Sequence, residues 1–129
     1  MKKLWFHERG NVTIEFAFVA PIFLLLVIGL FEFGRFYFTR VSMQYAIDEA
    51  GRFVMVNTAA TDAAIEERIG QNLFAVQPED VEVTLGSESH GGTTYRRIGV
   101  THEFEFAVFG ILGVAPLTIA TETRVPLLS

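Results

Sequence analysis

Few side chains in this sequence have the types and spacing that catalysis needs. There is no cysteine, which excludes thiol catalysis, thiolate metal sites and a disulfide framework. The three histidines, His7, His90 and His102, form no metal-binding motif. Glu103 and Glu105 would lie on one strand face roughly 7 Å apart, a distance at which paired carboxylates can act as acid and base. Because nothing around them indicates a cleft, a solvated strand face is the simpler interpretation. We predict no enzyme, no cofactor, no metal site and no small-molecule substrate.

Glu15 is a candidate of a different kind. It follows Gly10 by five residues and stands immediately before an uncharged apolar run that begins at Phe16. An acidic side chain at the edge of a membrane helix is costly in hydrocarbon, and such residues usually have a function. The alternative is a glutamate that lies near the lipid headgroups, where its cost is small.

The apolar run that positions Glu15 is long enough to cross a membrane. Residues 16–31 carry no charge, and twelve of them are Leu, Ile, Phe or Val. Together with residues 11–15 they form a stretch of about 21 residues, which is roughly 31 Å long as a helix. Pro21 lies inside this run, where a membrane helix tolerates it as a kink. We therefore predict a transmembrane helix over residues 11–32.

The charge distribution orients this helix. Residues 1–10 form a basic leader with a net charge of +2, and the remaining chain has −7. A basic segment before an apolar run stays in the cytoplasm, so we expect the rest of the chain on the outer side of the membrane. The acidic remainder argues against nucleic-acid binding.

Glu32 and Arg35 are three residues apart, and we predict that they pair at the membrane exit. Aromatic side chains typical of a membrane interface crowd this exit: Phe31, Phe33, Phe36, Tyr37 and Phe38.

Two alternatives explain the same N-terminal pattern. A secretory signal peptide would have a basic start, but bulky aromatics stand where its small-residue cleavage site should follow the apolar run. An uncleaved single-pass anchor with an interaction domain outside the membrane is the stronger alternative.

The order of basic leader, glycine, four residues, glutamate and apolar helix resembles the class III signal of type IV pilins and pseudopilins. The longer stretch RGNVTIEFAFVAPIFLLLVIGLFEFGR resembles the N-terminal signature of TadE-like minor pseudopilins of the tight-adherence (Tad/Flp) pilus system. The residues that carry the resemblance are Gly10, Glu15, Phe16, Pro21 and the exit sequence Glu32-Phe33-Gly34-Arg35.

This resemblance implies a bacterial inner-membrane protein that prepilin peptidase cleaves between Gly10 and Asn11. The new α-amine of Asn11 would lie one helical turn from Glu15, so the carboxylate can pair with the amine of a neighbouring subunit. The resemblance assigns Glu15 and Phe16 to assembly and recruitment. It implies a periplasmic C-terminal domain whose partners are other minor pseudopilins, the major pilin and the inner-membrane assembly platform of an adhesion pilus. A pseudopilin of a type II secretion system is a related alternative.

Outside the membrane the sequence predicts a pilin-like α+β body. The first helix should continue over residues 33–57, before a small domain over residues 58–129. The apolar positions of this helix recur at helical spacing and should pack on a sheet, with a filament contact as the alternative: Met43, Ile47, Ala50 and Val54. Thr61 is the predicted N-cap of a second helix over residues 62–72, with Ile65, Ile69 and Leu73 on its buried side.

Alternating apolar residues predict a three- to four-stranded antiparallel sheet. The expected strands cover residues 81–86, 98–106 and 117–125. A polar loop, SESHGG (87–92), should separate the first two strands, with a turn at Gly91-Gly92. The apolar segment 107–116 is too short to span a bilayer. We expect it to be a buried connection between strands, and the alternative is an exposed patch that meets another subunit or the membrane surface.

Overall fold

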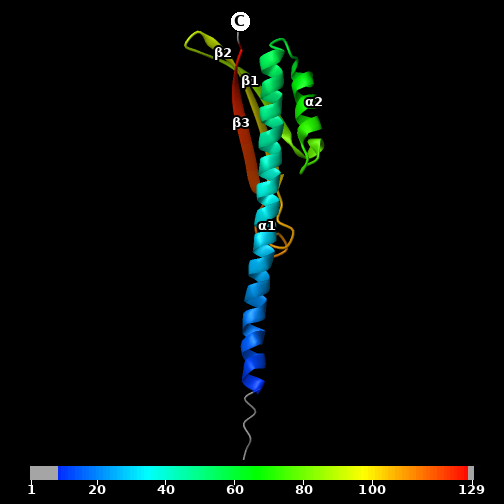
Figure 1. The fold of residues 1–129 in the computed structure, drawn as a ribbon, viewed down its shortest axis with the longest axis vertical. Helices are drawn as coiled ribbons and strands as arrows, with labels where there is room; N and C mark the ends of the chain where they lie inside the picture. Colours follow the sequence, from blue (N-terminus) through cyan, green and yellow to red (C-terminus); the bar gives the residue numbers. More distant parts are fainter. Residues whose placement is uncertain (1–8, 128–129) are drawn as a thin grey trace, which may run out of the picture.

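The computed structural model describes residues 9–127, with side chains from residue 12 onward. The rest of the predicted leader, including His7, lies outside the described residues. The elements follow in the order α1 (Arg9–Val56), α2 (Asp62–Asn72), the 3-10 helix η1 (Pro78–Asp80), β1 (Glu82–His90), β2 (Thr93–Phe104) and β3 (Leu117–Leu127). Figure 1 shows α2 and the sheet beside the C-terminal half of α1, while its N-terminal half extends away from them.

The helix α1 joins the predicted membrane segment to the small domain without a break. It has 48 residues and continues through Pro21, so this proline does not end the helix. Its apolar side chains from Val12 to Phe31 are mostly exposed. In the part of the chain that the structure describes, α1 is the one helix long and apolar enough to cross a membrane.

The three strands form one antiparallel sheet in the order β1-β2-β3. The first hairpin is longer than predicted, because residues 87–90 continue β1 as strand instead of forming a loop. Ser89 pairs with Thr94 and His90 with Thr93 across it. The predicted turn at Gly91-Gly92 is confirmed, with φ angles of 59° and 83°. Positive φ at both central positions is the hairpin geometry that glycine allows without strain.

The core lies between one face of α1, the buried face of α2 and one face of the sheet. The predicted apolar face of α1 is at most 2% exposed, and Ala46 joins it: Met43, Ile47, Ala50 and Val54. The chain's own sheet and α2 cover this face, so the alternative of a filament contact there is wrong. Opposite it lie the apolar side chains of β2 and β3, as their alternation predicted: Ile98, Val100, Phe104, Ile119 and Val125.

The second helix matches its prediction in extent and capping. The Thr61 hydroxyl accepts a hydrogen bond from the Ala64 amide at 3.3 Å, which satisfies one of the unpaired donors of the first turn. Ile65 and Ile69 are almost fully buried against α1 and the sheet.

Ser42 fixes the chain where it leaves α2. Its side chain is fully buried, and its hydroxyl oxygen accepts hydrogen bonds from the amides of Phe74 at 2.9 Å and Ala75 at 3.0 Å. One hydroxyl on α1 therefore satisfies two backbone donors of the segment that returns toward η1.

We expect Ser42→Ala to lower the free energy of unfolding of the domain by about 1–3 kcal/mol, because partly buried amide donors lose their acceptor. Urea unfolding of the full chain in detergent micelles would measure this change. Ser89→Ala, on the exposed part of the hairpin, is the matched control and should change the stability little. Equal stability of the two variants would contradict the role of Ser42.

The apolar segment 107–116 is not the buried connection that its composition predicted. Ile111 is 86% exposed and Leu112 65%, and only Phe109 is half-buried. The segment forms a compact loop that lies beside α1, near the end of the N-terminal half that neither α2 nor the sheet covers (Figure 1). The core space between α1 and the sheet is already filled by the strand residues, so the loop packs outside it.

Candidate functional site

The residues predicted to act in processing and assembly lie in the first turns of α1. Gly10 and Asn11 have helical backbone. Glu15 and Phe16 are exposed, and Phe16 is 70% accessible. This end of the helix points away from the domain (Figure 1), so the domain leaves it accessible to other molecules.

Glu32 and Arg35 lie side by side at the other end of the apolar run. The Arg35 guanidinium is 3.1 Å from the Glu32 carboxylate, which is the pairing that their spacing predicted. The Glu32 side chain is only 5% exposed, in contrast to the apolar side chains around it. A buried carboxylate needs hydrogen-bond donors, and Arg35 supplies one of them.

The second donor to Glu32 comes from the loop 106–114. The Val108 amide donates to the other carboxylate oxygen at 2.8 Å, across 76 residues of sequence. Glu32 therefore links α1, at the end of the apolar run, to this loop. It also forms an ion pair within its own helix. The i,i+3 spacing revealed the pair with Arg35, but nothing in the sequence indicated the contact with Val108.

The aromatic side chains at this exit divide into two groups. Phe36 packs edge-to-face on Phe104 with 5.5 Å between ring centroids, and Arg35 lies over the same Phe104 ring at 5.3 Å. Phe36 thus belongs to the domain core and not to an exposed belt. The others remain more than half exposed and are available to an interface: Phe31, Phe33, Tyr37 and Phe38.

We expect Glu32→Ala to release the loop from α1. A hydrogen bond to a charged group contributes about 1.5–3 kcal/mol, so amide exchange of Val108 should become about tenfold faster or more. Hydrogen exchange of the full chain in micelles would measure this. Glu32→Gln keeps an oxygen that accepts from Val108 and should show a smaller effect. Unchanged exchange in the alanine variant would show that the carboxylate does not hold the loop.

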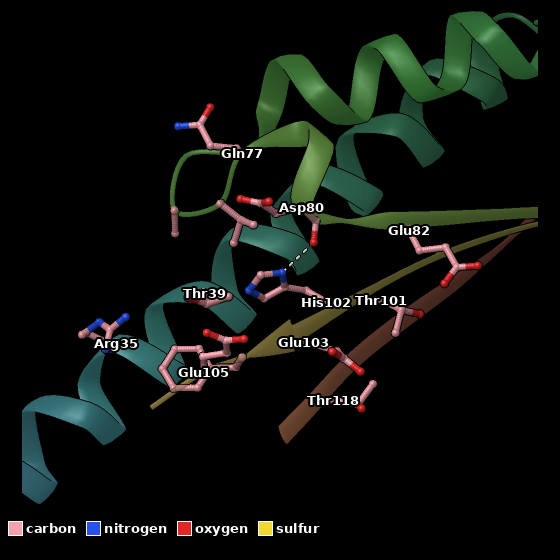
Figure 2. Close-up of a pocket in the computed structure, with 13 residues that line it drawn as sticks. Arg35, Thr39, Gln77, Asp80, Glu82, Thr101, His102, Glu103, Glu105 and Thr118 are labelled. Atoms are coloured by element: carbon pink, nitrogen blue, oxygen red, sulfur yellow. Dashed lines mark hydrogen bonds between the residues drawn. The ribbon is translucent and has the colours of Figure 1, made fainter. Parts of the chain in front are cut away.

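Three of the remaining titratable candidates, His102, Glu103 and Glu105, line an open cavity of about 740 Å³ beside α1, η1 and the end of β2 (Figure 2). His102 Nδ1 lies 2.7 Å from the Asp80 carbonyl oxygen, and this nitrogen therefore donates a proton to a structural hydrogen bond. Glu103 and Glu105 are both exposed at the end of β2. Among the described residues, no group of three metal-ligating side chains could hold a metal ion.

These features define a class of protein: an α+β protein whose N-terminal helix is a candidate membrane span and continues into a small domain. Within this class, the family model described as TadE-like protein matches residues 10–52. The match begins at Gly10 and includes Glu15, Pro21 and the exit pair. The resemblance predicted from the sequence is therefore confirmed over residues 10–52. Comparison with curated proteins and with solved structures gives no match.

Proposed function

We propose that this protein is a minor pilin-like subunit that takes part in the assembly of a bacterial Tad-type pilus. The observation that carries the proposal is the TadE-like match over residues 10–52, which begins at the glycine of the proposed cleavage site. The long helix supports it, because α1 supplies both an apolar first half for the membrane and a second half that packs into the domain.

In this proposal, prepilin peptidase cleaves between Gly10 and Asn11 on the cytoplasmic side of the inner membrane. Residues 11–32 then hold the subunit in the membrane, and the domain lies in the periplasm, in keeping with the basic leader and the acidic remainder. There it contacts other minor pseudopilins and the major pilin, while the assembly platform engages the membrane segment. Glu15 and Phe16 face these partners, because the chain's own domain lies at the other end of α1 (Figure 1).

Processing provides the test. The full chain is expressed with and without active prepilin peptidase, and its mass is measured after purification from membranes. We expect the mass of residues 1–10 to be lost only when the peptidase is present. A full-length chain in the presence of a peptidase that cleaves a known pilin would overturn the proposal and favour an uncleaved single-pass membrane protein with a periplasmic interaction domain.

A further inference from the structure

We propose that the loop 106–114 is a second membrane contact, whose tip at Ile111 and Leu112 enters the outer leaflet beside the exit of α1. This inference rests on the part of the proposed function that places the first half of α1 in a membrane. It adds a lipid-binding element from the C-terminal part of the chain, which is far from α1 in the sequence.

The position of the loop gives the first argument. The Val108 amide is bound to Glu32, and the Phe109 ring lies 3.7 Å from where a side chain at Gly29 would begin. The loop therefore descends along α1 by three residues, or about 4.5 Å, toward the middle of the apolar run. It passes the carboxylate that marks the end of the uncharged segment and reaches residues that lipid must cover if α1 spans the membrane.

The chemistry of the loop gives the second argument. No residue from 106 to 121 carries a charge, and the tip exposes Ile111 at 86% and Leu112 at 65%. The transfer of such side chains from water to an apolar environment is favourable, so their exposure indicates a surface that an apolar environment covers. Leu30 and Phe31, which follow Gly29 on α1, are also exposed, at 65% and 73%.

The backbone of the loop gives the third argument. A peptide segment enters lipid only when its amides have hydrogen-bond partners, because no water is there to replace them. All five amides from Gly110 to Val114 donate to carbonyls within the loop, at 3.0–3.2 Å. The Val108 amide is satisfied by Glu32. The tight winding depends on Gly110, where a Cβ atom would lie 2.3 Å from the Phe106 carbonyl oxygen.

A bilayer fits this surface better than a soluble protein partner does. The loop lies against the part of α1 that the bilayer itself covers, so a protein that covers the loop would also have to enter the membrane. The loop reaches only to Gly29, near one end of the apolar run. The expected depth is therefore shallow, close to the lipid headgroups.

The absence of cysteine allows a direct test by site-specific fluorescence. Leu112→Cys, labelled with an environment-sensitive fluorophore, is reconstituted as the full chain into phosphatidylcholine–phosphatidylglycerol vesicles. Leu25→Cys in the middle of the apolar run and Ser89→Cys on the hairpin are the matched controls. Lipids with a quencher near the headgroup or near the acyl-chain end report depth, and aqueous iodide reports exposure to water.

We expect the label at residue 112 to be blue-shifted, protected from iodide, and quenched more by the shallow lipid quencher than by the deep one. The label at Leu25 should be quenched most by the deep quencher, and the label at Ser89 by iodide alone. Adding Glu32→Ala to the labelled Leu112→Cys chain should reduce the lipid quenching, because the loop loses its attachment to α1.

Two results would overturn the inference while leaving the membrane span intact. In both, the label at Leu25 is quenched by lipid. In the first, the label at residue 112 is quenched by iodide as strongly as the label at Ser89. In the second, it is protected from iodide but not quenched by either lipid quencher, which would place it in a protein contact. If the label at Leu25 is itself accessible to iodide, the membrane span fails and the inference fails with it.

Discussion

Gly10→Phe is expected to leave the protein at full length in cells that contain active prepilin peptidase. A peptidase must hold the backbone on both sides of the bond it cuts, and glycine allows a close approach because it has no side chain. A bulky residue would displace that bond, and a displacement of about 1 Å reduces an enzymatic rate about 100-fold. The fraction of shortened chain, measured by mass spectrometry of membrane extracts, would report this loss.

Gly34→Phe is the matched control for this experiment. It places the same side chain on the same helix, at a position where an added Cβ atom would meet nothing within 4 Å. This variant should be processed like the unaltered protein. Normal shortening of the Gly10→Phe chain would contradict cleavage after Gly10, and loss of shortening in both variants would point to a general defect of membrane insertion.

Glu15→Ala is expected to separate processing from assembly. Cleavage should continue, because the residue lies beyond the proposed cut, but incorporation into the pilus machinery should fall about tenfold or more. Truncating one partner of a buried ion pair costs about 2–5 kcal/mol, largely because the other charge loses its partner. In the proposed assembly, that other charge is the α-amine of Asn11 on a neighbouring subunit.

Co-purification of the subunit with the major pilin, together with piliation of the cells, would measure this effect. Glu15→Gln keeps the size of the side chain and removes its charge, so it should resemble the alanine variant if ion pairing is the cause. Asp48→Ala removes an exposed acidic side chain elsewhere on α1 and serves as the control. Normal piliation with Glu15→Ala would remove the pairing role from this residue.

The parts of the fold that the sequence predicted are those that local physics determines. The bounds of α2 follow from Thr61, whose hydroxyl caps the helix, and from the helical spacing of Ile65 and Ile69. The inward face of β2 follows from the alternation that places Ile98, Val100 and Phe104 on one side. Each of these signals lies within a few residues of the feature it predicts.

The missed features depend on contacts between distant segments. The end of β1 was predicted too early because Ser89 and Thr94 pair through backbone hydrogen bonds and carry no apolar pattern. The segment 107–116 was expected to be buried because apolar composition is the same for a core segment and for an exposed apolar loop. The acceptor roles of Ser42 and Glu32 depend on partners that are 32 and 76 residues away.

The continuity of α1 sets the height of the domain and transmits the tilt of its anchor. If Glu32 lies at the bilayer surface, as proposed, the helix rises by 24 residues to Val56, or about 36 Å, with no break that could act as a hinge. Figure 1 places the β1–β2 hairpin near that far end. A partner that recognises the hairpin must therefore reach this distance above the membrane. Because α1 has no hinge, any tilt of the membrane segment within the bilayer moves the hairpin sideways.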